Sequence, residues 1–195
     1  MTIQTVNIGS VAGDGTGDSL REGGEKINAN FSELNSRVGD NEIDIASIQS
    51  RSYIQSVNTS DVTLSAVDTG EAISFTANTT ASGITRSGSE FTVDVDGLYW
   101  VSIMPVIFAG ASGSFYCWLQ TNTGAGWVNA SNSSVKAVLS NNDEINIPLL
   151  FSVPLLATNK IRIMCAVSST SIILNSSAPA FAPVVPSIST TIIRV

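Results

Sequence analysis

The sequence predicts a mainly β protein, in which an antiparallel sandwich follows one N-terminal helix. The first observation is a change of composition near residue 52, because residues 1–52 contain no proline and residues 53–195 contain all six. The second is a series of short apolar runs, separated by turn residues, throughout the later segment. The third is a helical repeat of apolar residues in the first segment. Many short strands without intervening helices favour an antiparallel sandwich.

The helix is predicted to begin after a glycine-rich stretch, because Ser19 and Glu22 have the spacing of a capping box. We expect helix over residues 19–52. Downstream, a set of residues alternates spacings of four and three, which is the a/d pattern of a coiled coil over three heptads. This seam consists of Ile27, Phe31, Leu34, Val38, Asn41, Ile45 and Ile48.

Two features of the seam favour a trimer. Ile45 at an a position and Ile48 at a d position favour three strands, and the polar Asn41 at a d position would fix register and strand number. Three heptads interrupted by glycines form a weak coil, so we expect it to depend on the domain behind it. The alternative is an amphipathic helix that packs on its own domain.

The strand candidates of the later segment are short, and most end at Gly, Asn or Asp turn residues. They cover residues 62–65, 72–76, 83–85, 90–95, 98–108, 114–121, 134–139, 144–153, 160–168, 171–174 and 189–195.

The strand expected over residues 98–108 is apolar on both faces. One face carries Tyr99, Val101 and Ile103, and the other carries Trp100 and Met104. A strand of an isolated antiparallel sandwich has one apolar and one polar face. We therefore expect the opposing sheet to cover one face and a neighbouring subunit to cover the other.

The first forty residues, read as one unit, resemble a module near the start of tailed-phage virion proteins, particularly tail-fibre, baseplate and head-fibre components. The resemblance is carried by residues 6–9 (Val-Asn-Ile-Gly), 13–21 (Gly-Asp-Gly-Thr-Gly-Asp-Ser-Leu-Arg) and 26–34 (Lys-Ile-Asn-Ala-Asn-Phe-Ser-Glu-Leu). It implies a virion location, and it implies that residues 1–18 dock onto other virion proteins of the tail, neck or capsid. The docking residues would be Val6, Ile8, Gly13, Asp14, Gly15, Thr16, Gly17, Asp18, Leu20 and Arg21.

A second resemblance covers residues 53–195. The stretches 88–93 (Gly-Ser-Glu-Phe-Thr-Val) and 96–101 (Asp-Gly-Leu-Tyr-Trp-Val), with the ending 190–195 (Thr-Thr-Ile-Ile-Arg-Val), resemble the tumour-necrosis-factor-like jelly roll, also seen in the complement globular head. In that family a Gly-x-Tyr step opens a central strand that lines a threefold axis. The resemblance implies a jelly-roll head whose trimer interface includes Tyr99, Val101 and Ile103.

The composition argues against several classes of chemistry. No histidine is present, so a Ser-His-Asp triad cannot form within this chain. The glycines of residues 13–17 lack the Gly-Lys-Ser/Thr of a phosphate loop, and the nearby acids are too few for a calcium loop. Cys117 and Cys165 lie in alternating apolar runs and are expected to be buried thiols. We therefore predict no cofactor and no metal site.

The net charge of −7, with nine scattered Lys and Arg residues, argues against nucleic acid as a partner. The most apolar run, residues 147–157, is short and contains two prolines, so we expect no membrane insertion. The first residues also lack the features of a signal peptide.

Two groups of residues are candidates for acting on or binding carbohydrate. The acids nearest to a glycoside-cleaving pair are Asp94, Asp96, Asp143 and Glu144, but each lies at a predicted turn, where acids are ordinarily solvated. Among the aromatic residues, core or interface packing is favoured for Tyr116 and Trp118, whereas exposure and packing remain equally open for Trp127. The predicted receptor contacts are Trp127, Asn129 and Asn132.

Together these observations predict a structural virion protein and not an enzyme: a homotrimeric short fibre, attached through its N-terminus, whose knob adheres to a host surface or glycan. The alternatives are a capsid decoration or cement protein, a head or neck fibre and, less favoured, a small polysaccharide-degrading enzyme.

Overall fold

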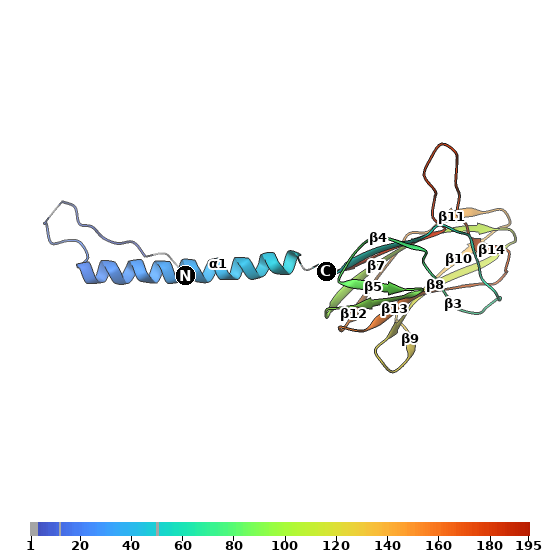
Figure 1. Ribbon diagram of the computed structural model, residues 1–195, viewed down its shortest axis with the longest axis horizontal. Helices are drawn as coiled ribbons and strands as arrows, with labels where there is room; N and C mark the ends of the chain where they lie inside the picture. Colours follow the sequence, from blue (N-terminus) through green and yellow to red (C-terminus); the bar gives the residue numbers. More distant parts are fainter. Residues whose placement is uncertain (1–3, 12, 50) are drawn as a thin grey trace. The chain divides into compact units, whose positions relative to one another are not determined.

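A computed structural model describes residues 4–11, 13–49 and 51–195, with the side chains of residues 47–49 outside the description. The chain divides into two compact units, Met1–Ser50 and Arg51–Val195 (Figure 1). This boundary agrees with the change of composition near residue 52.

The first unit consists of one long helix and the segment that precedes it. Helix α1 (Leu20–Gln49) has 30 residues and begins directly after Ser19, as the capping box predicts. The preceding segment turns back along the helix, because Gln4 and Asn30 exchange two hydrogen bonds of 2.8 Å. The predicted helix residues 51–52 lie outside α1, and residue 50 lies outside the described residues.

The second unit, called the head below, is a sandwich of two sheets in which all the strand pairs are antiparallel. The first sheet has the order β2 (Val62–Thr63), β14 (Ile172–Leu174), β7 (Gly97–Ala109), β15 (Ile188–Arg194), β1 (Tyr53–Asn58) and β4 (Ala77–Ser82), and β11 (Glu144–Asn146) and β12 (Leu149–Leu155) also pair with β7. The second has the order β10 (Val135–Leu139), β8 (Gly113–Asn122), β13 (Lys160–Val167), β6 (Glu90–Val93) and β5 (Ile84–Ser87), with β3 (Glu71–Ala72) on β13 and β9 (Trp127–Asn129) on β8 (Figure 1).

The core of the head lies between the two sheets. Strands β7 and β8 alternate buried and more exposed side chains, and the buried ones face the opposite sheet. Strand β13 alternates in the same way over Lys160–Ile163, whereas all of its residues from Ile163 onward are buried. Cys117 and Cys165 stand opposite each other on β8 and β13, and both are buried free thiols, which confirms the prediction for the two cysteines. Burial raises the pKa of the Cys165 thiol.

The structure differs from the predicted strands where a strand has little apolar pattern. Strand β4 has the sequence Ala-Asn-Thr-Thr-Ala-Ser with every side chain exposed, so it carries no period-2 signal. Strands β1 and β9 were also not predicted. The strand predicted over residues 144–153 is two strands, β11 and β12, with Pro148 between them, because proline has no N–H for the ladder.

The structure corrects the predicted head interface. Tyr99, Val101 and Ile103 are fully buried on the inner face of β7, so their side chains pack in the core of their own protomer. The Tyr99 hydroxyl donates a 2.6 Å hydrogen bond to the Val95 carbonyl. The same alternation turns Trp100 and Met104 outward, and both are exposed. The two-faced strand is confirmed, but the face available to a partner is the one opposite Tyr99.

The substitution Tyr99→Phe tests this internal role. It removes the donor to the Val95 carbonyl while keeping the ring, so we expect the free energy of unfolding of the head to fall by about 1 kcal/mol in denaturant titrations. Tyr116→Phe, at a partly exposed position of β8 in the second sheet, is the matched control and is expected to change it by less than about 0.5 kcal/mol. Equal effects of the two variants would contradict the role given to the Tyr99 hydroxyl.

Candidate functional site

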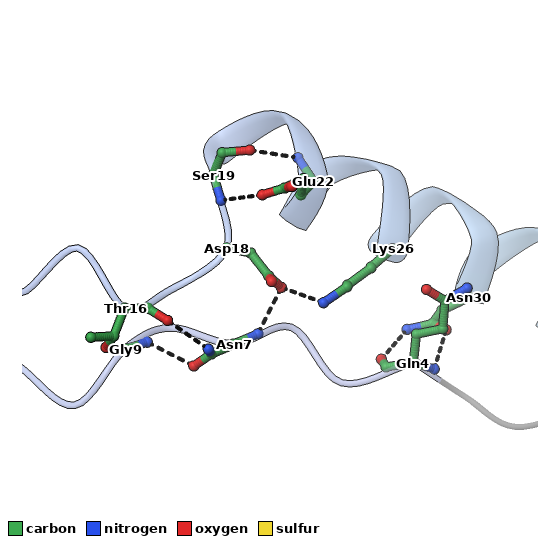
Figure 2. A network of polar contacts seen from close by, with 9 residues as sticks. All are labelled: Gln4, Asn7, Gly9, Thr16, Asp18, Ser19, Glu22, Lys26 and Asn30. Carbon is green, nitrogen blue, oxygen red and sulfur yellow. Dashed lines mark hydrogen bonds and ion pairs between the residues drawn. The ribbon is translucent and has the colours of Figure 1, made fainter.

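The segment before α1 is a loop closed by Asn7 and Asp18. The backbone N–H of Asp18 donates to the Asn7 carbonyl at 2.7 Å, and the N–H of Asn7 donates to Asp18 Oδ2 at 2.9 Å. The Asn7 side chain donates to the Thr16 carbonyl at 2.8 Å and accepts from the Gly9 N–H at 3.0 Å. Figure 2 shows how these contacts join the two sides of the loop.

The Asp14 carboxylate organises the loop interior. It accepts three backbone hydrogen bonds, from the N–H groups of Ser10 (2.7 Å), Val11 (2.8 Å) and Thr16 (2.9 Å). Hydrogen bonds from Thr16 and Val11 lower the pKa of Asp14 to about 2. The carboxylate therefore replaces the apolar core that so short a loop cannot build.

Glycine is required at three of the predicted docking positions. Gly13 and Gly15 have φ angles of 80° and 71°, in the left-handed region that favours glycine. A Cβ at Gly17 would lie 2.9 Å from the backbone nitrogen of Gly9, which leaves no room for a side chain. Backbone geometry therefore accounts for Gly13 and Gly15, and close backbone approach accounts for Gly17.

Charged and polar side chains join the loop to α1 (Figure 2). Lys26 Nζ lies 2.7 Å from Asp18 Oδ2, and this contact lowers the pKa of Asp18. Ser19 and Glu22 exchange the two bonds of a capping box, at 2.9 and 3.2 Å, and bonding to Ser19 lowers the pKa of Glu22.

Val6 and Gly23 provide the apolar contact between the segment and the helix. Gly23 is buried, and a Cβ on it would lie 3.4 Å from Val6 Cγ1, so the glycine that weakens the helix also lets the segment lie close to it. The structural roles of Asn7 and of the Gln4–Asn30 pair were not predicted from the sequence. An isolated polar residue shows no periodicity or spacing that would indicate its hydrogen-bond partner.

The ten predicted docking residues divide into six that build the loop, three that are exposed, and Val6, which packs on Gly23. Asp14, Asp18 and the three glycines build the loop, and Thr16 contributes its backbone to it. By contrast, Ile8 and Leu20 are exposed by 89% and 97% of their surface, and the Arg21 side chain lies beside Glu25 in an exposed pair at 4.0 Å. Val11, which was not predicted, is also exposed. The polar network thus fixes a loop that presents aliphatic side chains to solvent.

The seam of α1 forms a stripe of exposed apolar side chains. The exposed fraction ranges from 45% at Ile27 to 66% at Phe31, and Leu34, Val38 and Ile45 fall between them. Asn41 is also exposed, and the side chain of Ile48 lies outside the described residues. Ile27, Asn30, Phe31 and Leu34 border a groove of about 340 Å³.

A second apolar surface, called the outer patch below, covers the first sheet of the head. Trp100 on β7, Ile193 on β15 and Tyr53 on β1 stand in register across three neighbouring strands. All three are exposed, Trp100 by 50%. With Leu98, Met104 and Leu150 they complete the outer patch.

Residues 3–96 match the sequence model of a family described as "Bacteriophage T4 gp9/10-like protein, N-terminal". The chain is 58% identical over 40 residues to the baseplate wedge protein gp10 of Enterobacteria phage T4. That alignment covers 20% of this chain and 7% of the relative, so the chain spans a small part of the length of that protein.

The head is similar in fold to murine APRIL. The structures at pH 5.0 and pH 8.0 give TM-scores of 0.50 and 0.51, with 8% and 11% identity, over 74% of this chain and 99% of each APRIL chain. The chain combines a T4 gp9/10-like N-terminal segment with a tumour-necrosis-factor-like head. Both resemblances stated from the sequence are confirmed, and the first relates this chain to structural proteins of the phage baseplate and tail.

The structure does not bring the four candidate acids of this chain into one site. Asp94 and Asp96 precede β7, whereas Glu144 pairs with Phe108 near the far end of that strand. At about 3.3 Å per residue the two ends lie roughly 36 Å apart, well beyond the spacing of a glycosidase pair.

Individually, these acids stabilise local structure. Asp94 accepts from the Ser52 hydroxyl, Asp96 from the Ala157 N–H and Asp143 from the Ser140 N–H. The residues that the structure describes include no group of three or more acidic, Cys or His side chains placed to hold a metal ion. Within the described residues, no helix has both the length and the apolar character needed to cross a membrane.

The predicted receptor contacts lie near one another on the outer face of the second sheet. Asn129 and Asn132 line a hollow together with Tyr116 and Trp118. Trp127 lies next to it, with the Arg162 guanidinium 4.2 Å from its ring centroid. The sequence favoured core or interface packing for Tyr116 and Trp118. The core alternative is wrong, because both side chains are partly exposed on the outer face.

Acidification is expected to loosen the N-terminal loop between about pH 4 and pH 2. The pKa of Asp14 in the folded loop lies below its unfolded value of about 3.9, so its contribution is complete above that value and is lost as the pH falls through about 2. The measurement is NMR amide exchange at Ser10, Val11 and Thr16.

The substitution Asp14→Asn should raise these exchange rates at neutral pH. Asp40→Asn, at an exposed position of α1, is the control and should leave them unchanged. A titration midpoint near 4 for the Asp14 carboxyl would contradict its role as an acceptor of three backbone hydrogen bonds.

Proposed function

We propose that this chain is a homotrimeric virion appendage, which attaches through its N-terminal loop, forms a short coiled-coil stalk and displays the head as a knob that adheres to the host surface. It acts by binding and not by catalysis. The observation that carries the proposal is the apolar stripe of α1, which keeps heptad spacing and stays exposed in the protomer.

Packing against other copies of the same helix would bury the exposed seam residues, because each copy presents apolar side chains at the same heptad spacing. Each apolar side chain that passes from half exposed to buried contributes roughly 1 kcal/mol, so the five described ones of each chain form a weak but useful interface. The isoleucine at position 45 and the polar Asn41 support three strands.

The outer patch supports a trimeric head as well as a trimeric stalk. Monomeric soluble proteins seldom expose large contiguous apolar patches, and the outer patch places Trp100, Ile193 and Tyr53 side by side. Aromatic residues are enriched at protein interfaces. Because three heptads that contain glycines form a weak coil, the head is expected to contribute most of the assembly energy.

Attachment through the N-terminal loop is supported by two observations. The T4 gp9/10-like match includes this segment, and the relative is a baseplate wedge protein. The loop is folded by polar contacts yet presents Ile8, Val11 and Leu20 to solvent. These side chains are available to a virion partner without any rearrangement of the loop.

The oligomeric state is tested by light scattering on the full-length chain. We expect a mass of about 60 kDa, three times the 20.4 kDa of one chain. The double variant Trp100→Asp with Ile193→Asp should shift the mass toward the monomer, because it places charges in the outer patch.

Two further variants sharpen this measurement. Phe31→Asp in the seam should stay trimeric but lose helix stability, whereas Val138→Asp, an exposed aliphatic on the second sheet, should change neither property. A monomeric wild-type chain would contradict the homotrimer, and an unchanged mass in the double variant would contradict the outer patch as its interface.

Attachment is tested with phage particles assembled without this chain. The double variant Ile8→Asp with Leu20→Asp should lower incorporation at least about tenfold, since each change places a charge in a contact that excludes water. Val138→Asp again serves as the control. Normal incorporation of the double variant would contradict docking through the loop, and binding to purified heads in preference to tails would favour the decoration alternative.

A further inference from the structure

The strongest unassigned feature of the head is a hollow of about 950 Å³ on the outer face of the second sheet. We infer that it binds a neutral saccharide. The inference deepens the adhesive role proposed above by naming a ligand class, but it rests on side chains of the head alone.

The floor of the hollow consists of aromatic rings beside a small residue. Tyr116 and Trp118 are neighbouring outward residues of β8, because their side chains alternate with the buried Cys117. Ala166 on β13 stands opposite Tyr116 in register, and its methyl group leaves space that a larger side chain would fill.

The Trp118 ring is fixed in place without a ligand. Its Nε1–H donates to Asn129 Oδ1 at 2.9 Å. A Cβ on Gly70 would lie 2.7 Å from Cζ2 and Cη2 of the ring, so the backbone at Gly70 packs closely against the six-membered ring of the indole. The ring therefore offers a stacking surface that loses no rotamer entropy when a ligand binds.

A chain of polar contacts fixes the Asn129 side chain as well. Arg162 donates to Gln120 Oε1 at 2.7 and 2.8 Å, and Gln120 Nε2 donates to Asn129 Oδ1 at 2.9 Å. Because the Asn129 oxygen accepts from both Gln120 and Trp118, its amide nitrogen takes no part in these bonds. That nitrogen keeps two N–H donors for a ligand hydroxyl.

The two walls add further polar groups at unusual backbone positions. Asp68 and Asn132 both line the hollow, and both are non-glycine residues with positive φ, 51° and 59°. Residues held in this region concentrate at binding and active sites. The Ser133 hydroxyl is engaged within the protein, because it accepts from the Leu119 N–H and donates to the Ala130 carbonyl. These bonds hold the segment that carries Asn132.

This combination fits a sugar ring. The C–H face of a pyranose stacks on an aromatic ring, and its hydroxyls need both donors and acceptors at the rim. The lining contains one carboxylate, Asp68, and no basic residue. The nearby cations are engaged with rings, Lys136 at 5.5 Å from the centroid of Tyr116 and Arg162 over Trp127. A neutral saccharide is therefore favoured over an acidic one.

The hollow also stays open in the proposed trimer. It lies on the second sheet, whereas the outer patch lies on the first, and the outer faces of a two-sheet sandwich point in opposite directions. Three hollows per knob would let weak single-site binding act together on a repetitive surface polysaccharide.

The test presents the full-length chain to immobilised neutral oligosaccharides built from glucose, galactose, mannose and N-acetylhexosamines, alongside sialylated and uronic-acid oligosaccharides. Affinity for the strongest neutral hit is then measured by titration calorimetry. We expect binding to at least one neutral oligosaccharide and none to the acidic set.

Three variants locate the binding. Trp118→Ala should weaken it at least about tenfold through loss of stacking. Asn132→Gly, which keeps the positive φ and removes only the side chain, should weaken it about fivefold. Phe181→Ala, an exposed aromatic of the head that does not line the hollow, should leave the affinity unchanged.

The outcomes separate this inference from the proposed function. No binding to any neutral oligosaccharide, a preference for acidic ones, or equal affinity of wild type and Trp118→Ala would overturn the saccharide site, even where the chain is trimeric and incorporated into particles. A monomeric chain that binds a neutral oligosaccharide through Trp118 would support the site and overturn the trimer.

Discussion

The structure of the head depends on the alternation of side chains along β7. This 13-residue strand pairs with β11, β12, β14 and β15, so its register sets the positions of four neighbours. Its inner side chains fill the core, and its outer ones begin the outer patch. Folding of the protomer and exposure of an apolar face are therefore two results of one period-2 pattern.

Features that depend on local spacing were predictable from the sequence. The Ser19–Glu22 capping box joins residues three positions apart, whose geometry is nearly independent of the rest of the chain. The face of β7 that enters the core was not predictable, because both faces are apolar and periodicity alone has no preference between them. The family resemblance then pointed to Tyr99, on the inner face.

Features that depend on distant partners were missed. The polar strand β4 exists because β1 offers it a ladder, and its own six residues give no apolar signal. The hollow on the second sheet joins Asp68 and Gly70 to Trp118 and Asn132, which lie far apart in the sequence. Asn129 and Asn132 were predicted as contacts, but the fixed position of Trp118 follows only from its neighbours in the fold.

For the proposed docking of the N-terminal loop, the contacts of Asp14 have a consequence for the kinetics of association. Charge-assisted hydrogen bonds to three backbone N–H groups hold its shape while Ile8 and Leu20 remain in water. A segment ordered in advance loses little conformational entropy when it meets a partner. Its rate of complex formation is then set by diffusion and orientation, with no slow folding step between encounter and the final contact.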